Sequence, residues 1–171
     1  MSTDYRPLIL TAQPEPAAAA RLDALRRKYF PPERNQLRAH ITLFHALPGS
    51  EADAVVRQVQ ALARGHRPIT VEVPGLRSLG GGVALALRSP VLEALRAELA
   101  HSFAGVLTAQ DAQGFRAHVT IQNKVTAAVA RATLAQLTAA FEPWSFEVTG
   151  IGIWRYAGGP WEAVKVVALR A

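Results

Sequence analysis

The chain has 171 residues, no cysteine and a formal net charge of +6, and half of its residues are hydrophobic. The missing cysteine excludes disulfides, thiolate catalysis and cysteine-ligated zinc, and the composition is typical of a globular chain rather than a disordered one. The N-terminus lacks the order of a signal peptide, and no apolar run approaches the ~18 residues of a membrane span, so we expect a cytoplasmic protein without a membrane partner. We also expect a monomer. The basic balance favours anionic partners such as nucleic acid or phosphorylated small molecules.

Hydrophobic periodicity, with proline and glycine as breakers, predicts alternating strands and helices. In chain order we expect a strand at 6–12, a helix at 16–29, a strand at 39–47, a helix at 51–64, strands at 68–78 and 83–88, a helix at 89–103, a strand within 114–124, a helix at 126–141, and strands at 145–156 and 161–169.

Two pairs of segments repeat along the chain. Residues 38–43 read RAHITL and residues 116–121 read RAHVTI, while 71–76 (VEVPGL) resembles 146–151 (FEVTGI). Two copies are too few for a solenoid. The repetition instead predicts a duplicated α/β or α+β fold with pseudo-two-fold symmetry. One motif strand would then lie in each copy.

Alternation along a strand separates the polar motif residues from their apolar neighbours. The expected free face carries His40, Thr42 and Phe44 in the first copy, and His118, Thr120, Gln122 and Lys124 in the second. Ile41, Leu43 and His45 are expected on the opposite, core-facing side, where His45 would have a structural role. Symmetry would bring the two free faces together.

Paired histidines on one face suit in-line displacement at phosphorus. One neutral imidazole takes a proton from the attacking oxygen, and the other, protonated, donates to the leaving oxygen. A pKa near 6.5 lets two histidines hold opposite protonation states near neutral pH, and threonine hydroxyls can bind non-bridging phosphate oxygens. This chemistry requires no metal or other cofactor. A zinc site that pairs His40 with His45 is disfavoured because the two side chains are expected on opposite faces.

The paired motifs, one in each half, resemble the two-histidine (2H) phosphoesterase superfamily, which includes bacterial 2′-5′ RNA ligase-like proteins and 2′,3′-cyclic nucleotide phosphodiesterases. Residues 118–124 and 154–162 look like one bacterial branch of the 2′-5′ RNA ligase family. The resemblance implies a bilobal α+β fold, a single domain of two packed, pseudo-two-fold-related lobes around a central cleft. Each lobe would have an antiparallel sheet flanked by helices and would carry one motif strand. The resemblance also implies catalytic roles for the two motif histidines, His40 and His118, and phosphate contacts for Thr42 and Thr120. It also implies a substrate with a 2′,3′-cyclic phosphate or 2′-5′ phosphodiester bond, on an RNA end or a small nucleotide.

Four further residues are candidates for substrate binding. Lys124 would meet a phosphate or lie in solvent, and Phe44 would stack on a base or pack in the core. Arg155 and Tyr156 flank the second glycine turn, which would rim the cleft. Two alternatives to a phosphodiesterase stay open: a non-catalytic module that binds RNA or a nucleotide, and a reversible 2′-5′ RNA ligase that runs the same acid–base chemistry backwards.

Overall fold

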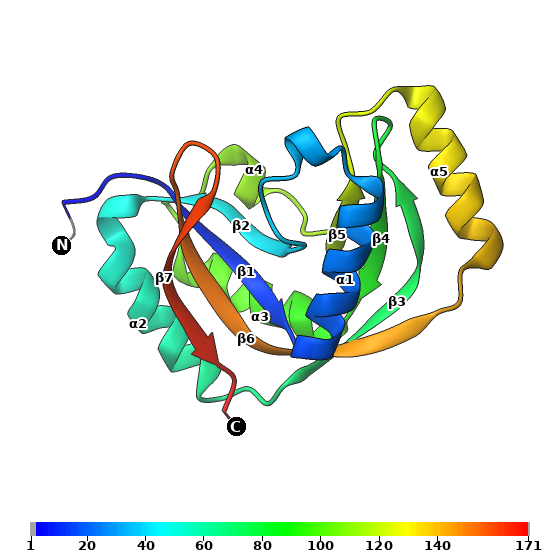
Figure 1. Ribbon diagram of the computed structural model, residues 1–171. Helices are drawn as coiled ribbons and strands as arrows, with labels where there is room; N and C mark the ends of the chain where they lie inside the picture. The colour runs from blue at the N-terminus through cyan, green and yellow to red at the C-terminus, as the bar shows by residue number, and fades with distance from the viewer. Residues whose placement is uncertain (1–2, 171) are drawn as a thin grey trace.

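The computed structural model describes residues 3–170, which form an α+β fold with an antiparallel seven-stranded sheet flanked by helices (Figure 1). All the predicted strands and helices are present, and three short helical turns, η1, η2 and α4, were not predicted. The strands are β1 (Leu8–Pro14), β2 (Ile41–Leu47), β3 (Ile69–Ser78), β4 (Val83–Arg88), β5 (His118–Gln122), β6 (Trp144–Tyr156) and β7 (Trp161–Ala168); the helices are α1 (Pro16–Tyr29), η1 (Pro32–Arg34), η2 (Gly49–Glu51), α2 (Ala52–Ala63), α3 (Pro90–Ser102), α4 (Ala109–Ala112) and α5 (Ala127–Ala140).

The sheet has the order β2-β1-β6-β3-β4-β5, with β7 on the other edge of β6. The first residues of β6, from Trp144 to Val148, pair with β3, and the residues from Val148 to Arg155 pair with β1. Figure 1 shows β6 in orange running across the molecule from the α5 side to the hairpin with β7. This one long strand therefore joins the two halves of the sheet.

The two repeats exchange strands. The β3–β4 hairpin follows the first motif in sequence, yet β4 pairs with β5, the strand of the second motif. In the same way β6, from the second repeat, pairs with β1 beside the first motif strand. The strands β2 and β5 end up at opposite ends of the sheet order but have Cα atoms within 8 Å of each other. The sheet therefore curls until its two end strands, which carry the motifs, meet.

Two buried arginines tie each repeat to the motif strand of the other. Arg26, on α1 of the first repeat, donates from Nη1 to the carbonyl of Thr120 in β5 at 3.1 Å. Arg96, on α3 of the second repeat, donates from Nε to the carbonyl of Leu43 in β2 at 3.2 Å. Both side chains are less than 10% exposed. Hydrogen bonds from a charged donor contribute about 1.5–3 kcal/mol each, so these contacts fix the two motif strands relative to one another.

The hydrophobic core lies between the sheet and the buried faces of its helices. Leu92, Leu95 and Leu99 form the buried stripe of α3, at the helical spacing expected from the sequence. Helix α1 packs on β5 and α5 packs on β3 and β4. Within the described residues, none of the helices has the length and apolar character needed to cross a membrane.

Candidate active site

A β-bulge interrupts the first motif strand three residues after its histidine. Thr11 of β1 lies opposite Thr42, but the next paired residue, Leu10, lies opposite Phe44, so Leu43 is the extra residue. A bulge places two successive residues opposite one and reverses the alternation beyond it. The half-buried His40 and Thr42 alternate with the buried Ile41 and Leu43, whereas Phe44, directly after Leu43, is buried as well.

The second motif strand has the matching bulge. Ala84 lies opposite Thr120 and Val83 lies opposite Gln122, which leaves Ile121 as the extra residue. In both copies the bulge therefore follows the His-x-Thr triplet directly. Regular pairing stops directly after each threonine. The residues that follow therefore do not continue the simple alternation of the motif.

The bulges overturn three of the expected positions. Phe44 has no exposed surface and packs edge-on against Phe103, with ring centroids 5.6 Å apart, so it belongs to the core and not to a stacking surface. Gln122 is also buried, and its Nε2 donates to Thr133. Lys124 lies beyond the end of β5, exposed and with a φ of 64°, and therefore has no place on the strand face. The prediction that these residues share the histidine face is wrong.

His45 also lies on the side opposite to the one expected, but it has the expected structural role. Its Nδ1 is 3.0 Å from Oδ1 of Asp111, and its backbone N–H donates to the same oxygen at 2.8 Å. The Asp111 carboxylate, fully buried at the end of α4, also accepts the N–H of Ala46. The His45 side chain itself is 47% exposed.

Arg155 is a structural residue rather than a member of a cleft rim. It is 8% exposed and donates from Nη1 to the carbonyls of Asp4 and Arg6. Its Nε lies 3.3 Å from the Asp4 carboxylate. These contacts hold the N-terminal segment against β6, so the expected role in substrate binding is wrong. Tyr156 is 48% exposed, and its substrate contact stays a prediction.

The two motif histidines are held in the same way. The Nδ1 of His40 is 2.8 Å from the carbonyl oxygen of Arg38, and the Nδ1 of His118 is 2.9 Å from that of Arg116. A carbonyl only accepts hydrogen bonds, so in each ring Nδ1 carries the proton. The Nε2 atom of each ring is then the one left for exchanging protons with a bound molecule.

The electrostatic surroundings favour neutral rings. Burial, aided by the charges of Arg26 and the other nearby histidines, lowers the pKa of His40 to about 4. Burial also lowers the pKa of His118, with the positive charge of Arg77 acting in the same direction. In each case the hydrogen bond to the backbone carbonyl opposes the shift without cancelling it. At pH 7 both Nε2 atoms therefore carry lone pairs, so both rings are bases in the empty site.

The threonines of the motifs are available for a ligand. Thr42 and Thr120 are half-buried, and within residues 3–170 neither side-chain hydroxyl has a hydrogen-bond partner. In the same part of the chain, no three or more His, Asp or Glu residues gather in a way that could hold a metal ion.

Sequence reasoning missed two residues that contact the histidines. Arg77, at the end of β3, lies with Nη1 3.4 Å from Nδ1 of His118. Because that nitrogen donates to a carbonyl and a guanidinium cannot accept, this contact is electrostatic rather than a hydrogen bond. Trp161, at the start of β7, lies with its ring centroid 4.7 Å from that of His40, tilted by 58°. The signal for both was their place beside a glycine turn of the repeat.

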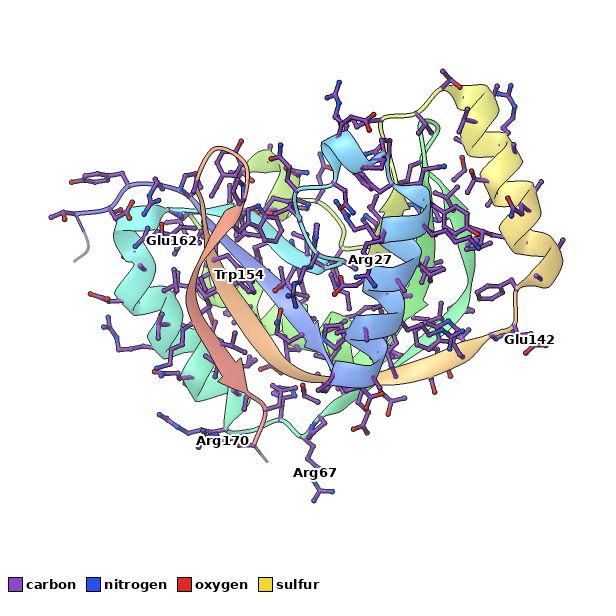
Figure 2. The ribbon with its side chains drawn as sticks, in the orientation of Figure 1. Arg27, Arg67, Glu142, Trp154, Glu162 and Arg170 are labelled. Carbon is purple, nitrogen blue, oxygen red and sulfur yellow. The ribbon has the colours of Figure 1, made fainter. Side chains whose placement is uncertain are left out.

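A pocket of about 470 Å³ opens beside His40. Its walls come from β1, α1, the loop at 36–39 and the β6–β7 hairpin. The side chains of Trp154 and Trp161 line it, and Figure 2 labels Trp154 on the part of β6 that lies between β1 and β7. A pocket of this size with aromatic walls and a few polar groups suits an organic ligand of nucleotide size.

Comparisons with known proteins agree with this architecture. A family model described as the 2′-5′ RNA ligase superfamily matches residues 14–160. The chain is similar to the crystal structure of TT0787 of Thermus thermophilus, with 15% identity, 96% of this chain and 98% of that chain covered, and a TM-score of 0.67. It is also similar to E. coli LigT complexed with NADP+, with 20% identity, coverage of 98% and 100%, and a TM-score of 0.63. At these identities the likeness establishes a common fold. A search among curated proteins gave no match.

Proposed function

The chain belongs to the 2′-5′ RNA ligase superfamily, and from this premise we propose that it is a phosphoesterase acting on 2′,3′-cyclic phosphate or 2′-5′ phosphodiester bonds of RNA ends or small nucleotides. The observation that carries the proposal is the matched anchoring of His40 and His118. Each ring is fixed through Nδ1 to the carbonyl two residues earlier, so each offers Nε2 for proton transfer. A histidine that only filled space would not need this arrangement in both halves.

The proposed reaction is an in-line displacement at phosphorus. One Nε2 removes a proton from the attacking water, and the other, protonated, gives its proton to the leaving oxygen. Both rings are neutral in the empty site, so one must be charged before reaction. A bound phosphodiester supplies the reason, because its negative charge favours an imidazolium nearby and offsets the depressed pKa of His40 and His118.

Three further side chains would bind the phosphate. The unpaired hydroxyls of Thr42 and Thr120 donate to its non-bridging oxygens, each from a position two residues after one of the histidines. Arg77 is half-buried beside His118 and adds a positive charge where negative charge develops in the transition state. The structures of E. coli LigT complexed with NADP+, ATP and 3′-AMP support a nucleotide as the ligand.

The test is hydrolysis of 2′,3′-cyclic nucleotides and of 2′-5′-linked dinucleotides in the presence of a chelator. His40→Ala and His118→Ala should each reduce kcat on the order of 10²–10⁴-fold. His101→Ala, an exposed histidine on α3, is the matched control and should retain activity. Binding of substrate without product in the wild-type protein would favour the binding module, and joining of a 2′-5′ bond from cleaved ends would show the ligase direction.

A further inference from the structure

The symmetry of the repeat is broken beside the two motif histidines. Arg77 and Gly152 occupy equivalent positions, because each directly follows the segment repeated in β3 and β6. Arg77 lies opposite Ala84 in its sheet half, and Gly152 lies opposite Thr11 in the other. Beside the second motif strand, an arginine therefore lies opposite a small residue, alanine. Beside the first motif strand, a glycine lies opposite a polar residue, threonine. The pocket beside His40 occupies the glycine side.

The glycine makes room for a chain of polar side chains. A Cβ atom at position 152 would lie 2.6 Å from Nε1 of Trp154 and 2.8 Å from both Oγ1 of Thr11 and Oε1 of Gln13. In the space left by the glycine, Trp154 donates from Nε1 to Oγ1 of Thr11 at 2.9 Å, and that hydroxyl donates to Oε1 of Gln13 at 2.7 Å. An indole N–H only donates and an amide oxygen only accepts, so the direction of both hydrogen bonds is fixed.

The fixed direction leaves hydrogen-bonding groups for a ligand in the pocket. With its oxygen engaged, Gln13 has an Nε2 group without a partner among residues 3–170. On the opposite wall, Asp23 accepts the N–H of Ala39 at Oδ1, and its Oδ2 has no partner in the same range. Trp161 supplies an aromatic face. A flat ring with both acceptors and donors on its edge, which describes a nucleobase, matches this set.

A second hollow continues from the first along α1. It has a volume of about 610 Å³ and shares part of its wall with the first pocket, including Asp23 and Arg38. Its wall also includes the exposed Arg27 and the buried Arg26. The wall therefore contains three arginines and one aspartate, which gives this hollow a net positive charge. An exposed arginine next to a pocket for a base is well placed to bind the phosphates of a nucleic-acid backbone.

From these observations we propose that the two hollows form one groove for a single RNA strand, with a base in the tryptophan-lined pocket beside His40 and the neighbouring phosphates on Arg27 and Arg38. This inference rests on the proposed function and narrows it. The substrate is then the end of an oligonucleotide, and a free cyclic mononucleotide fills only part of the groove.

The test compares kcat/KM for an RNA tetranucleotide ending in a 2′,3′-cyclic phosphate with kcat/KM for the cyclic mononucleotide of the same base. The wild-type protein should favour the tetranucleotide roughly tenfold. Two phosphates bound in the groove release counterions, so kcat/KM should also depend more steeply on salt for the tetranucleotide. Between 50 and 200 mM salt, kcat/KM for the tetranucleotide should fall about sevenfold more than kcat/KM for the mononucleotide. In the double variant Arg27→Gln/Arg38→Gln the preference and the extra salt dependence should both disappear.

The matched control is Arg67→Gln/Arg131→Gln, which removes the same charge from exposed positions outside the groove. Figure 2 shows Arg67 at the bottom of the molecule, away from Arg27 on α1. Equal values for both substrates, or equal losses in the two double variants, would overturn the groove while leaving the phosphodiesterase intact. If no substrate is turned over, the proposed function fails instead. The groove is then decided by fluorescence anisotropy of a 3′-phosphorylated tetranucleotide, whose affinity must fall in the groove variant and not in the control.

Discussion

The buried carboxylate of Asp111 gives the most demanding prediction about stability. It accepts hydrogen bonds from the backbone N–H groups of His45 and Ala46 at 2.8 and 3.0 Å and lies 3.0 Å from Nδ1 of His45. Asp111→Ala would leave two backbone donors at the end of β2 without a partner. Each unsatisfied buried donor costs about 1–3 kcal/mol, so we expect a loss of about 2–6 kcal/mol in the free energy of unfolding.

Urea unfolding at pH 7 measures this loss, with Gln110→Ala, an exposed neighbour on α4, as the control. Asp111→Asn keeps one acceptor and should lose less. Burial alone raises the pKa of Asp111, but the hydrogen bonds from His45 and Ala46 outweigh it and hold the pKa below its ordinary value of 3.8. The stabilisation by the carboxylate is therefore present above pH 4 and is lost on further acidification. Equal urea midpoints for Asp111→Ala and Gln110→Ala would refute the reasoning.

Two further predictions concern the site. Because the pKa of His40 is about 4 and that of His118 is also lowered, the form with one charged and one neutral ring exists in the free protein only at acidic pH. We therefore expect kcat/KM to be highest at acidic pH and to fall as the pH rises to 8, with the kcat optimum at higher pH once phosphate is bound. A kcat/KM that rises from pH 6 to 8 would contradict this. Gly152→Ala should lower the free energy of unfolding by about 1–3 kcal/mol, because the added methyl group overpacks the site. Gly75→Ala should be tolerated, because a Cβ atom at position 75 meets no other atom within 4 Å. Differential scanning fluorimetry should therefore show a lower Tm for Gly152→Ala alone.

The arrangement of helices and strands was predictable because local signals agree with it. The prolines at the start of α1 and α3, the glycine turns of both hairpins and the apolar stripe of α3 each act within a few residues. The short helix α4 was missed because four residues are too few for a periodic pattern. The repeat also predicted correctly that the two motif strands would meet.

The sequence does not show where regular pairing stops. Alternation placed Phe44 and Lys124 beside the motif histidines, but the bulge at Leu43 moves Phe44 into the core, and β5 ends before Lys124. Each bulge depends on which residue of the neighbouring strand lies opposite, which is a property of the sheet and not of the motif. His45 changes sides for the same reason.

The partners of the site residues come from distant parts of the chain. Asp111 contacts a strand 66 residues earlier in sequence, and Arg77 contacts His118 across 41 residues. The strand exchange between the repeats produces the second contact, because it places β3 and β4 next to the second motif strand rather than the first. The place of Arg77 beside a glycine turn was visible in the sequence, but its contact with His118 follows from the topology of the sheet.

The central claim is that His40 and His118 act together as one acid–base pair. The most direct measurement is kcat for a 2′,3′-cyclic nucleotide in His40→Ala, His118→Ala and the double variant. Residues that act as a unit are strongly non-additive, so we expect the double variant to lose about as much activity as either single variant. Losses that multiply in the double variant, or wild-type kcat in either single variant, would contradict the paired mechanism.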